Sequence, residues 1–307
     1  MNKSKQLTDG ALLTVIFVVL LLVNTIVPVL MVVLAVPFII FAAKYDWKPS
    51  LIMLGVATIL SMLFATIYSL PIPILVGLGG IMIGTAIYRE RSPYETWARG
   101  TLGFVAGILF FFLFAFIMMD VNVIEEFNAQ IDQSLDMSKQ LILDFGMGEV
   151  SEEEIGTVEQ QVMLFKQLVP VMVVLASIFL ALVNQWVSYK ILNRIERKQL
   201  HFPKFRNLRL PTAIIWIYLL AMVGTLFQMD SSDTVYIALQ NVIMLTEFLL
   251  ILQGISFIFF YSHHKNISKA IPIITTVFVF LLPILLPLVR IIGIIDLGFG
   301  LKDRMVK

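Results

Sequence analysis

Residues 10–43 read GALLTVIFVVLLLVNTIVPVLMVVLAVPFIIFAA, an uncharged run of 34 residues. An α-helix needs about 20 apolar residues to cross the hydrocarbon core of a bilayer. The run is too long for one ordinary span and short for two, and Asn24, Thr25 and Pro28 near its centre predict a hairpin of two short helices. Lys3 and Lys5 precede the run without an obvious small-residue cleavage site, so we expect a retained first helix rather than a signal peptide.

The rest of the chain repeats this pattern. Further apolar runs of spanning length cover Pro49–Tyr88, which Pro71 and Pro73 divide in two, Gly100–Met119, Gln167–Tyr189, Leu210–Met229, Thr234–Ser262 and Ala270–Val289. Backbone groups in hydrocarbon must be hydrogen-bonded internally, so each run should be a helix. The sequence therefore predicts an all-α fold, a polytopic transmembrane helical bundle of about eight to ten membrane segments.

Composition supports the same class. Hydrophobic residues make up 59% of the 307 residues and charged residues 14%, whereas soluble domains are about 25% charged. Such a chain has too few charges to cover a water-soluble surface. The absence of cysteine excludes disulfides, thiolate metal sites and cysteine nucleophiles.

Charge divides the chain into three expected regions. Residues 1–119 form an N-terminal membrane bundle, residues 120–166 an acidic extracytoplasmic segment, and residues 167–307 a C-terminal membrane bundle with a basic cytoplasmic loop at 190–209. In the acidic segment, apolar residues from Ile124 to Leu135 recur at helical spacing. This spacing predicts an outer amphipathic helical hairpin, either lying on the membrane surface or forming a lid over an extracellular cavity.

The basic residues predict the orientation. Sixteen of the 22 lysines and arginines fall in alternate loops, whereas residues 120–166 contain eleven of the 21 acids and only two lysines. Because cytoplasmic loops are enriched in Lys and Arg, we expect a cytoplasmic N-terminus and an external acidic segment. Nine spans would leave the basic tail outside, so we expect Pro283 and Pro287 to break the last run and return the tail to the cytoplasm.

Glu247 lies near the middle of the eighth apolar run. An unpaired charge at that depth costs at least about 2.5 kcal/mol, and embedded acids commonly mark substrate or ion pathways. Gln240 and Gly254 lie seven residues to either side and share its helix face. This polar stripe predicts either a substrate or proton path or a buried contact between helices.

Few residues can pair with Glu247. Arg290 is the only basic residue that the apolar runs place inside the hydrocarbon, and either an Arg290–Glu247 or an Arg290–Asp296 pair is open. Asn184 and Gln185, toward the inner end of the sixth run, are further candidates for a polar path.

Two GxxxG patterns occur in neighbouring runs. They are Gly80 with Gly84 and Gly103 with Gly107. Small residues four apart let helix backbones approach closely, so we expect these helices to pack on each other. Dimerisation or docking of a partner subunit is the alternative.

The sequence lacks the motifs of familiar enzymes. HExxH, GxSxG, Walker A and GxGxxG patterns are all absent. His263 and His264 have no neighbouring acid or third histidine, and nothing resembles a nucleic-acid-reading module. We therefore expect no enzyme activity, no cofactor, no metal site and no nucleic-acid partner. The basic loop at 190–209 is typical of a membrane-surface segment or of a docking site for a partner.

Three stretches resemble the YybS family of predicted bacterial integral membrane proteins. They are Thr8-Asp9-Gly10-Ala11-Leu12-Leu13, Gln253-Gly254-Ile255 and Ile292-Gly293-Ile294-Ile295-Asp296-Leu297-Gly298-Phe299, with a basic tail close behind. The resemblance covers nearly the whole chain. It implies a multi-pass protein of the bacterial cytoplasmic membrane and brings no established activity with it.

Residues 8–119 also resemble, more distantly, the substrate-capture subunits of energy-coupling factor vitamin transporters. The shared features are a short first hairpin, a Gly-rich fourth helix and the basic loop Tyr88-Arg-Glu-Arg91. Those subunits dock their energising module through small residues at AxxxA spacing on the first helix. Gly10 and Thr14 have that spacing here, but both alanines are missing.

Two functions remain open at this point. Transport or capture of a small molecule is favoured by the stripe through Glu247 and by the proline-broken helices. No ATP-binding motif is present, so any ATP drive would come from a membrane or ATPase partner subunit. The alternative is a non-catalytic membrane scaffold or assembly factor that recruits envelope partners through the basic loop and the acidic hairpin.

Overall fold

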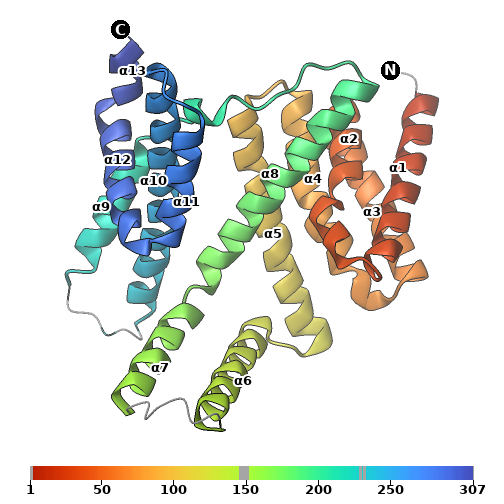
Figure 1. Cartoon of the computed structure of the whole chain (residues 1–307). Helices are drawn as coiled ribbons and strands as arrows, with labels where there is room; N and C mark the ends of the chain where they lie inside the picture. The colour runs from red at the N-terminus through yellow and green to blue at the C-terminus, as the bar shows by residue number, and fades with distance from the viewer. Residues whose placement is uncertain (1–2, 145–151, 228–229, 231–232, 307) are drawn as a thin grey trace. The chain divides into compact units, whose positions relative to one another are not determined.

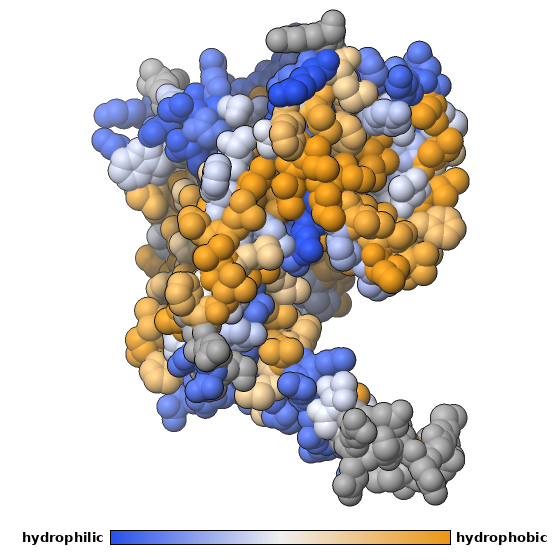
Figure 2. Space-filling model, turned by 90° about the vertical axis from the view of Figure 1, so that its left-hand side faces the viewer, coloured by the Kyte–Doolittle hydropathy of each residue, from blue (hydrophilic) through white to orange (hydrophobic). Residues whose placement is uncertain are grey.

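The computed structural model describes residues 3–144, 152–227, 230 and 233–306, and every regular element in these ranges is helical. The chain divides into two compact units, residues 1–202 and 203–307. In the described ranges, seven segments are long and apolar enough to cross a membrane, which confirms the predicted all-α polytopic fold. Figure 2 shows broad hydrophobic surface on one face of the molecule, and many large hydrophobic side chains of these segments are exposed, as expected for helices in contact with lipid.

Unit 1 contains the first eight α-helices (Figure 1). They are α1 (Lys3–Asn24), α2 (Val36–Tyr45), α3 (Trp47–Phe64), α4 (Pro71–Tyr88), α5 (Pro93–Met119), α6 (Val123–Asp144), α7 (Glu152–Lys166) and α8 (Val169–Ile195), with short 3-10 helices at Pro28–Val33 and Ile67–Ser69. The break between α1 and α2 confirms the hairpin predicted for residues 10–43, although α1 alone is 22 residues long.

The units divide the chain differently from the predicted regions. Helix α8 was expected in a C-terminal bundle, but it packs against α5 and α2 in unit 1. One tie is the indole N–H of Trp97 in α5, which donates to the carbonyl oxygen of Ile178 in α8 at 2.9 Å. The boundary between the units, after Phe202, falls inside the predicted basic loop at 190–209 rather than before α8.

The four glycines of the GxxxG patterns lie at close helix crossings in unit 1. A Cβ on Gly103 or Gly107 would meet backbone atoms of α4, so these two glycines let α5 and α4 approach. Gly80 and Gly84 instead face α2, at the carbonyl oxygens of Ala35 and Ile39. The α4 pattern thus packs on a different helix from the one expected, because α4 lies between α2 and α5 and offers each a separate glycine face.

Basic residues from several predicted cytoplasmic loops meet at one end of unit 1. Lys44 at the end of α2 pairs with Asp9 of α1 at 2.5 Å and with Glu196 after α8 at 3.8 Å. Arg89 after α4 pairs with Asp46 at 3.5 Å. Loops predicted on one side of the membrane therefore share one end of the unit.

The acidic segment forms the predicted helical hairpin at the opposite end, where α6 runs antiparallel to α7 and α7 continues the direction of α8 (Figure 1). Lys166 of α7 pairs with Asp132 of α6, and Lys139 of α6 pairs with Glu159 of α7, each at 2.5 Å. Both lysines of the segment are thus paired across the hairpin.

Unit 2 contains α9 (Ala213–Gly224), α10 (Thr234–His264), α11 (Ala270–Leu281), α12 (Leu286–Phe299) and α13 (Leu301–Val306), with 3-10 turns at Phe205–Asn207 and Pro283–Leu285. The predicted span Leu210–Met229 is reduced to the 12 residues of α9. Twelve residues rise about 18 Å, which is less than the hydrocarbon core of about 30 Å. Pro211 precedes the helix and Gly224 ends it, so the apolar run is longer than the helix it forms.

The predicted ninth span Ala270–Val289 is also shorter than expected. The chain breaks at Pro283 and turns by 111° between α11 and the segment that contains α12. The predicted break is found at Pro283, whereas Pro287 lies in the first turn of α12. The tail returns to the first connector of the unit, where Asp303 pairs with Arg209. This hairpin of two short helices is the feature that positions the candidate site.

Candidate functional site

The candidate site is an ion pair in unit 2 between Glu247 of α10 and Arg290 of α12. Tyr218 of α9 completes it. Its hydroxyl donates to Glu247 Oε1 at 3.3 Å, and its ring lies 5.6 Å from the guanidinium carbon of Arg290. The sequence left Glu247 and Asp296 open as partners of Arg290, and in the structure Arg290 pairs with Glu247.

Helix order explains why these side chains meet. Arg290 follows the break at Pro283 by about two turns, so the break brings its turn of α12 beside the middle of α10. Helices α10 and α12 also approach very closely. A Cβ on Gly254 would collide with the carbonyl oxygen of Val289, and a Cβ on Gly293 with that of Leu250. Gly254 therefore acts as a packing residue that sets the distance between the two helices.

The pair is only half-buried. The Glu247 side chain is 31% exposed and the Arg290 side chain 24%. Charges at this depth are stable only when they face protein, water or each other. The pair neutralises both charges, yet leaves part of each side chain open to whatever surrounds the unit.

A second polar cluster lies about two turns further along the same helices. Gln253 of α10 donates to Asp296 of α12 at 2.6 Å and to the carbonyl oxygen of Leu208 at 3.2 Å. Lys302 of the tail lies 3.3 Å from Asp296 and donates to Ser256 and to Leu208, each at 2.8 Å. Asp296 and Lys302 are 2% and 4% exposed. This cluster is a closed structural joint between α10, α12, the connector and the tail.

Burial affects the ionisation of the lysine in this joint. Removal from water lowers the pKa of Lys302 from its ordinary value of 10.5, and the charge of Asp296 offsets part of that change.

The other predicted site residues lie elsewhere. Gln240 is half-buried, seven residues before Glu247 on α10. Asn184 and Gln185 belong to α8 of unit 1 and are buried there. The Asn184 amide donates to the carbonyl oxygens of Val32 and Leu180, and the Gln185 amide donates to that of Pro93 and to the Tyr189 hydroxyl. Both tie α8 to neighbouring segments of unit 1.

Sequence reasoning missed Tyr218 and Lys302 as members of these clusters. Tyr218 is a lone phenol inside an apolar run, which is a usable signal because a buried hydroxyl normally has a partner. Lys302 gave no such signal, since basic residues after a last helix are ordinary topology markers.

Among the described residues, no group of three or more histidines, aspartates or glutamates is arranged to hold a metal ion.

The first-helix surface compared above with transporter docking faces is covered in unit 1. A Cβ on Gly10 would lie 3.2 Å from the ring of Phe41, and Thr14 is buried. No solved structure matches the chain, so the resemblance of residues 8–119 to the substrate-capture subunits gains no support.

Comparisons with known proteins cover nearly the whole chain. It is 24% identical over 309 residues to the uncharacterized protein YybS of Bacillus subtilis (strain 168), across 99% of this chain and all of that protein. Residues 15–297 match the model of a family described as predicted membrane protein (DUF2232). The chain therefore belongs to this DUF2232 family of membrane proteins.

Proposed function

We propose that the protein captures or transports a small charged solute through unit 2, with Glu247 and Arg290 as the binding groups. The observation that carries the proposal is their half-exposed ion pair near the middle of a spanning helix, beside the broken hairpin of α11 and α12. Discontinuous helices beside charged groups at mid-membrane are a recurring arrangement in transporters.

The chemistry of the pair defines the class of solute. A carboxylate on the solute can replace Glu247 at the Arg290 guanidinium, and an amine can replace Arg290 at the Glu247 carboxylate. Because the two groups already neutralise each other, a solute that exchanges with one of them avoids leaving an isolated charge in the membrane.

The proposal includes the setting. The protein lies in the bacterial cytoplasmic membrane, with its N-terminus and basic loops in the cytoplasm and α6 and α7 outside. In unit 1, Lys44, Arg89 and Lys198 lie near one end. This supports placing the loops that contain them on the same side of the membrane. Any ATP drive would be supplied by a partner subunit.

The test uses the full chain in lipid nanodiscs. Its melting temperature is measured with a panel of amino acids, carboxylic acids and amines, and uptake of each stabilising solute is then measured in proteoliposomes. Glu247→Gln and Arg290→Gln should lose both the stabilisation and the uptake. Val242→Ala, which changes an exposed residue on the far side of the same helix, should keep both. Wild-type uptake by Glu247→Gln would contradict the proposal.

A scaffold function is the second candidate, and the acidic hairpin favours it. With its two lysines already paired, this hairpin presents mostly acidic groups to the surroundings. Absence of any stabilising solute in the panel, together with co-purification of envelope proteins that requires residues 120–166, would support this candidate instead.

A further inference from the structure

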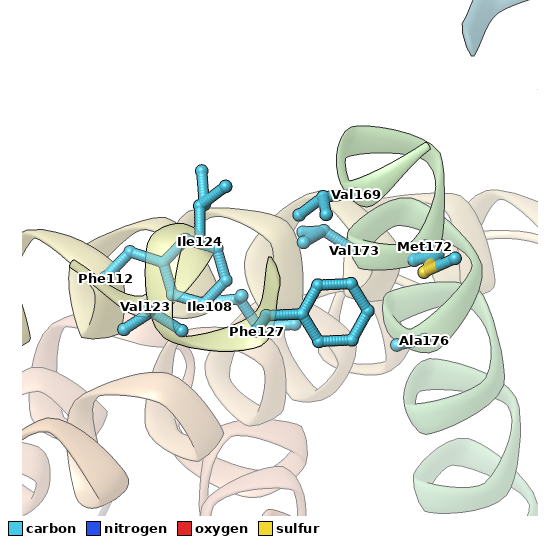
Figure 3. A pocket seen from close by; sticks show the side chains of 9 residues that line it. All are labelled: Ile108, Phe112, Val123, Ile124, Phe127, Val169, Met172, Val173 and Ala176. Carbon is cyan, nitrogen blue, oxygen red and sulfur yellow. The ribbon is translucent and has the colours of Figure 1, made fainter. Parts of the chain in front are cut away.

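Unit 1 contains an apolar cavity of about 260 Å³, partly open to its surroundings, where α5, α6 and α8 meet (Figure 3). Its lining residues come from these three helices. They are Ile108 and Phe112 of α5, Val123, Ile124 and Phe127 of α6, and Val169, Met172, Val173 and Ala176 of α8. Figure 3 shows the ring of Phe127 extending from α6 toward Ala176 of α8.

The cavity lies near one end of the spanning helices. Helices α5 and α8 have 27 residues each, which gives a length of about 40 Å against a hydrocarbon core of about 30 Å. The α8 lining residues occupy its first turns, and Phe112 precedes the end of α5 by about two turns. The cavity is thus at the depth where acyl chains join lipid headgroups.

The lining selects a hydrocarbon occupant. All nine side chains are apolar, so no hydrogen-bonding group is present to orient a polar molecule or to hold water. Large apolar side chains close in sequence to the lining residues are exposed, including Met119 at the end of α5 and Phe165 at the end of α7. These residues indicate contact between this region and lipid, which supplies acyl chains at high local concentration.

Charge then selects the headgroup. Residues 120–166 carry eleven acids and two lysines, and both lysines are already paired within the hairpin. Asp120, Glu125 and Glu126 lie close in sequence to the α6 lining residues and are exposed. An anionic headgroup would meet repulsion here and would find no free lysine of this segment, whereas the ammonium of a zwitterionic headgroup would be attracted.

We propose that this cavity holds one acyl chain of a zwitterionic phospholipid, with its headgroup beside the acidic start of α6. The bound chain fills the space between α5 and α8 and supports the first turns of α6 above it. This site is separate from the Glu247–Arg290 pair and does not depend on the function proposed for that pair.

The experiment is photo-crosslinking in nanodiscs with a phosphatidylethanolamine that carries a diazirine in its acyl chain. Cross-linked residues are mapped by mass spectrometry. Ala176→Phe and Val173→Phe each fill the cavity from α8. Ala106→Phe is the matched control because Ala106 is exposed on α5 and does not line the cavity. Melting temperatures of all variants verify folding.

We expect cross-links on the lining residues, with a severalfold loss in either filling variant and no loss in Ala106→Phe. A phosphatidylglycerol probe with the same diazirine chain should label the lining severalfold less at low salt. Labelling spread evenly over α5 and α8, or unchanged in a folded filling variant, would overturn the acyl-chain site. Equal labelling by the two lipids would overturn the headgroup preference.

Discussion

The two polar clusters of unit 2 are built on the same pair of helices and differ in what remains open. The Asp296–Lys302 pair is almost fully buried, and Gln253, Ser256 and a backbone carbonyl satisfy its polar atoms. The Glu247–Arg290 pair is about a quarter to a third exposed, and Tyr218 is its additional described partner. A satisfied, buried pair fixes structure, whereas a half-open pair can exchange partners.

The largest expected effect comes from removing the helix contact on which both clusters depend. Gly254→Val or Gly293→Val would place side-chain atoms against backbone carbonyls that cannot move aside. Overpacking a core typically lowers the free energy of unfolding by about 1–3 kcal/mol, and we expect a loss at least this large here. It would be seen as a lower melting temperature and a loss of monodisperse protein.

Gly55→Ala is the control for that change. Gly55 lies in α3, and a Cβ there would meet no atom within 4 Å. Its melting temperature should stay the same or rise slightly, since alanine favours the helix. A Gly254→Val variant as stable as Gly55→Ala would contradict the close crossing of α10 and α12.

Breaking the buried pair should have the next largest effect. Lys302→Met leaves Asp296 buried without its cationic partner, and loss of one partner of a buried pair costs about 3–5 kcal/mol. The double variant Asp296→Asn with Lys302→Met removes both charges and should recover much of that loss. Thermal unfolding of the purified variants measures both effects. A double variant less stable than Lys302→Met would contradict the expected cost of leaving one member of the buried pair alone.

The half-open pair should matter less for stability. We expect Glu247→Gln and Arg290→Gln each to lower the melting temperature less than Lys302→Met does, because the charge that remains is partly exposed rather than buried. The exchanged double variant Glu247→Arg with Arg290→Glu should restore the melting temperature but not solute binding. If Glu247→Gln destabilised the protein as strongly as Lys302→Met, the contrast between the clusters would be lost.

The smallest expected effect is a pH dependence. The lowered pKa of Lys302 means that the folded chain releases this proton at a lower pH than the unfolded chain. Between the folded pKa and 10.5 the unfolded state binds more protons, so stability rises with pH in that window. The wild-type melting temperature should therefore rise relative to that of Lys302→Met as pH approaches 10.5. Melting temperatures of the wild type and Lys302→Met that change in parallel with pH would contradict this expectation.

The contrast also explains how far sequence could lead. The uncharged runs predicted a membrane bundle because a single segment in hydrocarbon can satisfy all its backbone hydrogen bonds only as a helix. Glu247 and Arg290 were recognisable because charges are rare in such runs. Hydropathy could not predict that α9 would stop at Gly224, or that α4 would turn Gly80 toward α2, because lipid-facing and packed apolar residues look alike.

The family-like stretches acquire a structural explanation. Gln253 and Asp296 belong to two of them and are hydrogen-bonded to each other, while Gly254 and Gly293 from the same stretches form the helix crossing. Asp9 from the third stretch binds Lys44 and the Tyr45 hydroxyl. These contacts join segments far apart in the chain, so local pattern reasoning located the residues without revealing their partners.

The most direct measurement is water access to the Glu247–Arg290 pair. The chain has no cysteine, so single cysteines can be introduced without further changes. Ile243→Cys lies one helical turn from Glu247 on the same face, whereas Val242→Cys lies roughly 140° around the helix from Glu247 and is exposed. In nanodiscs, a small charged thiol reagent should modify Ile243→Cys severalfold faster than Val242→Cys. Equal, negligible modification of both would contradict a solute-accessible site at the pair.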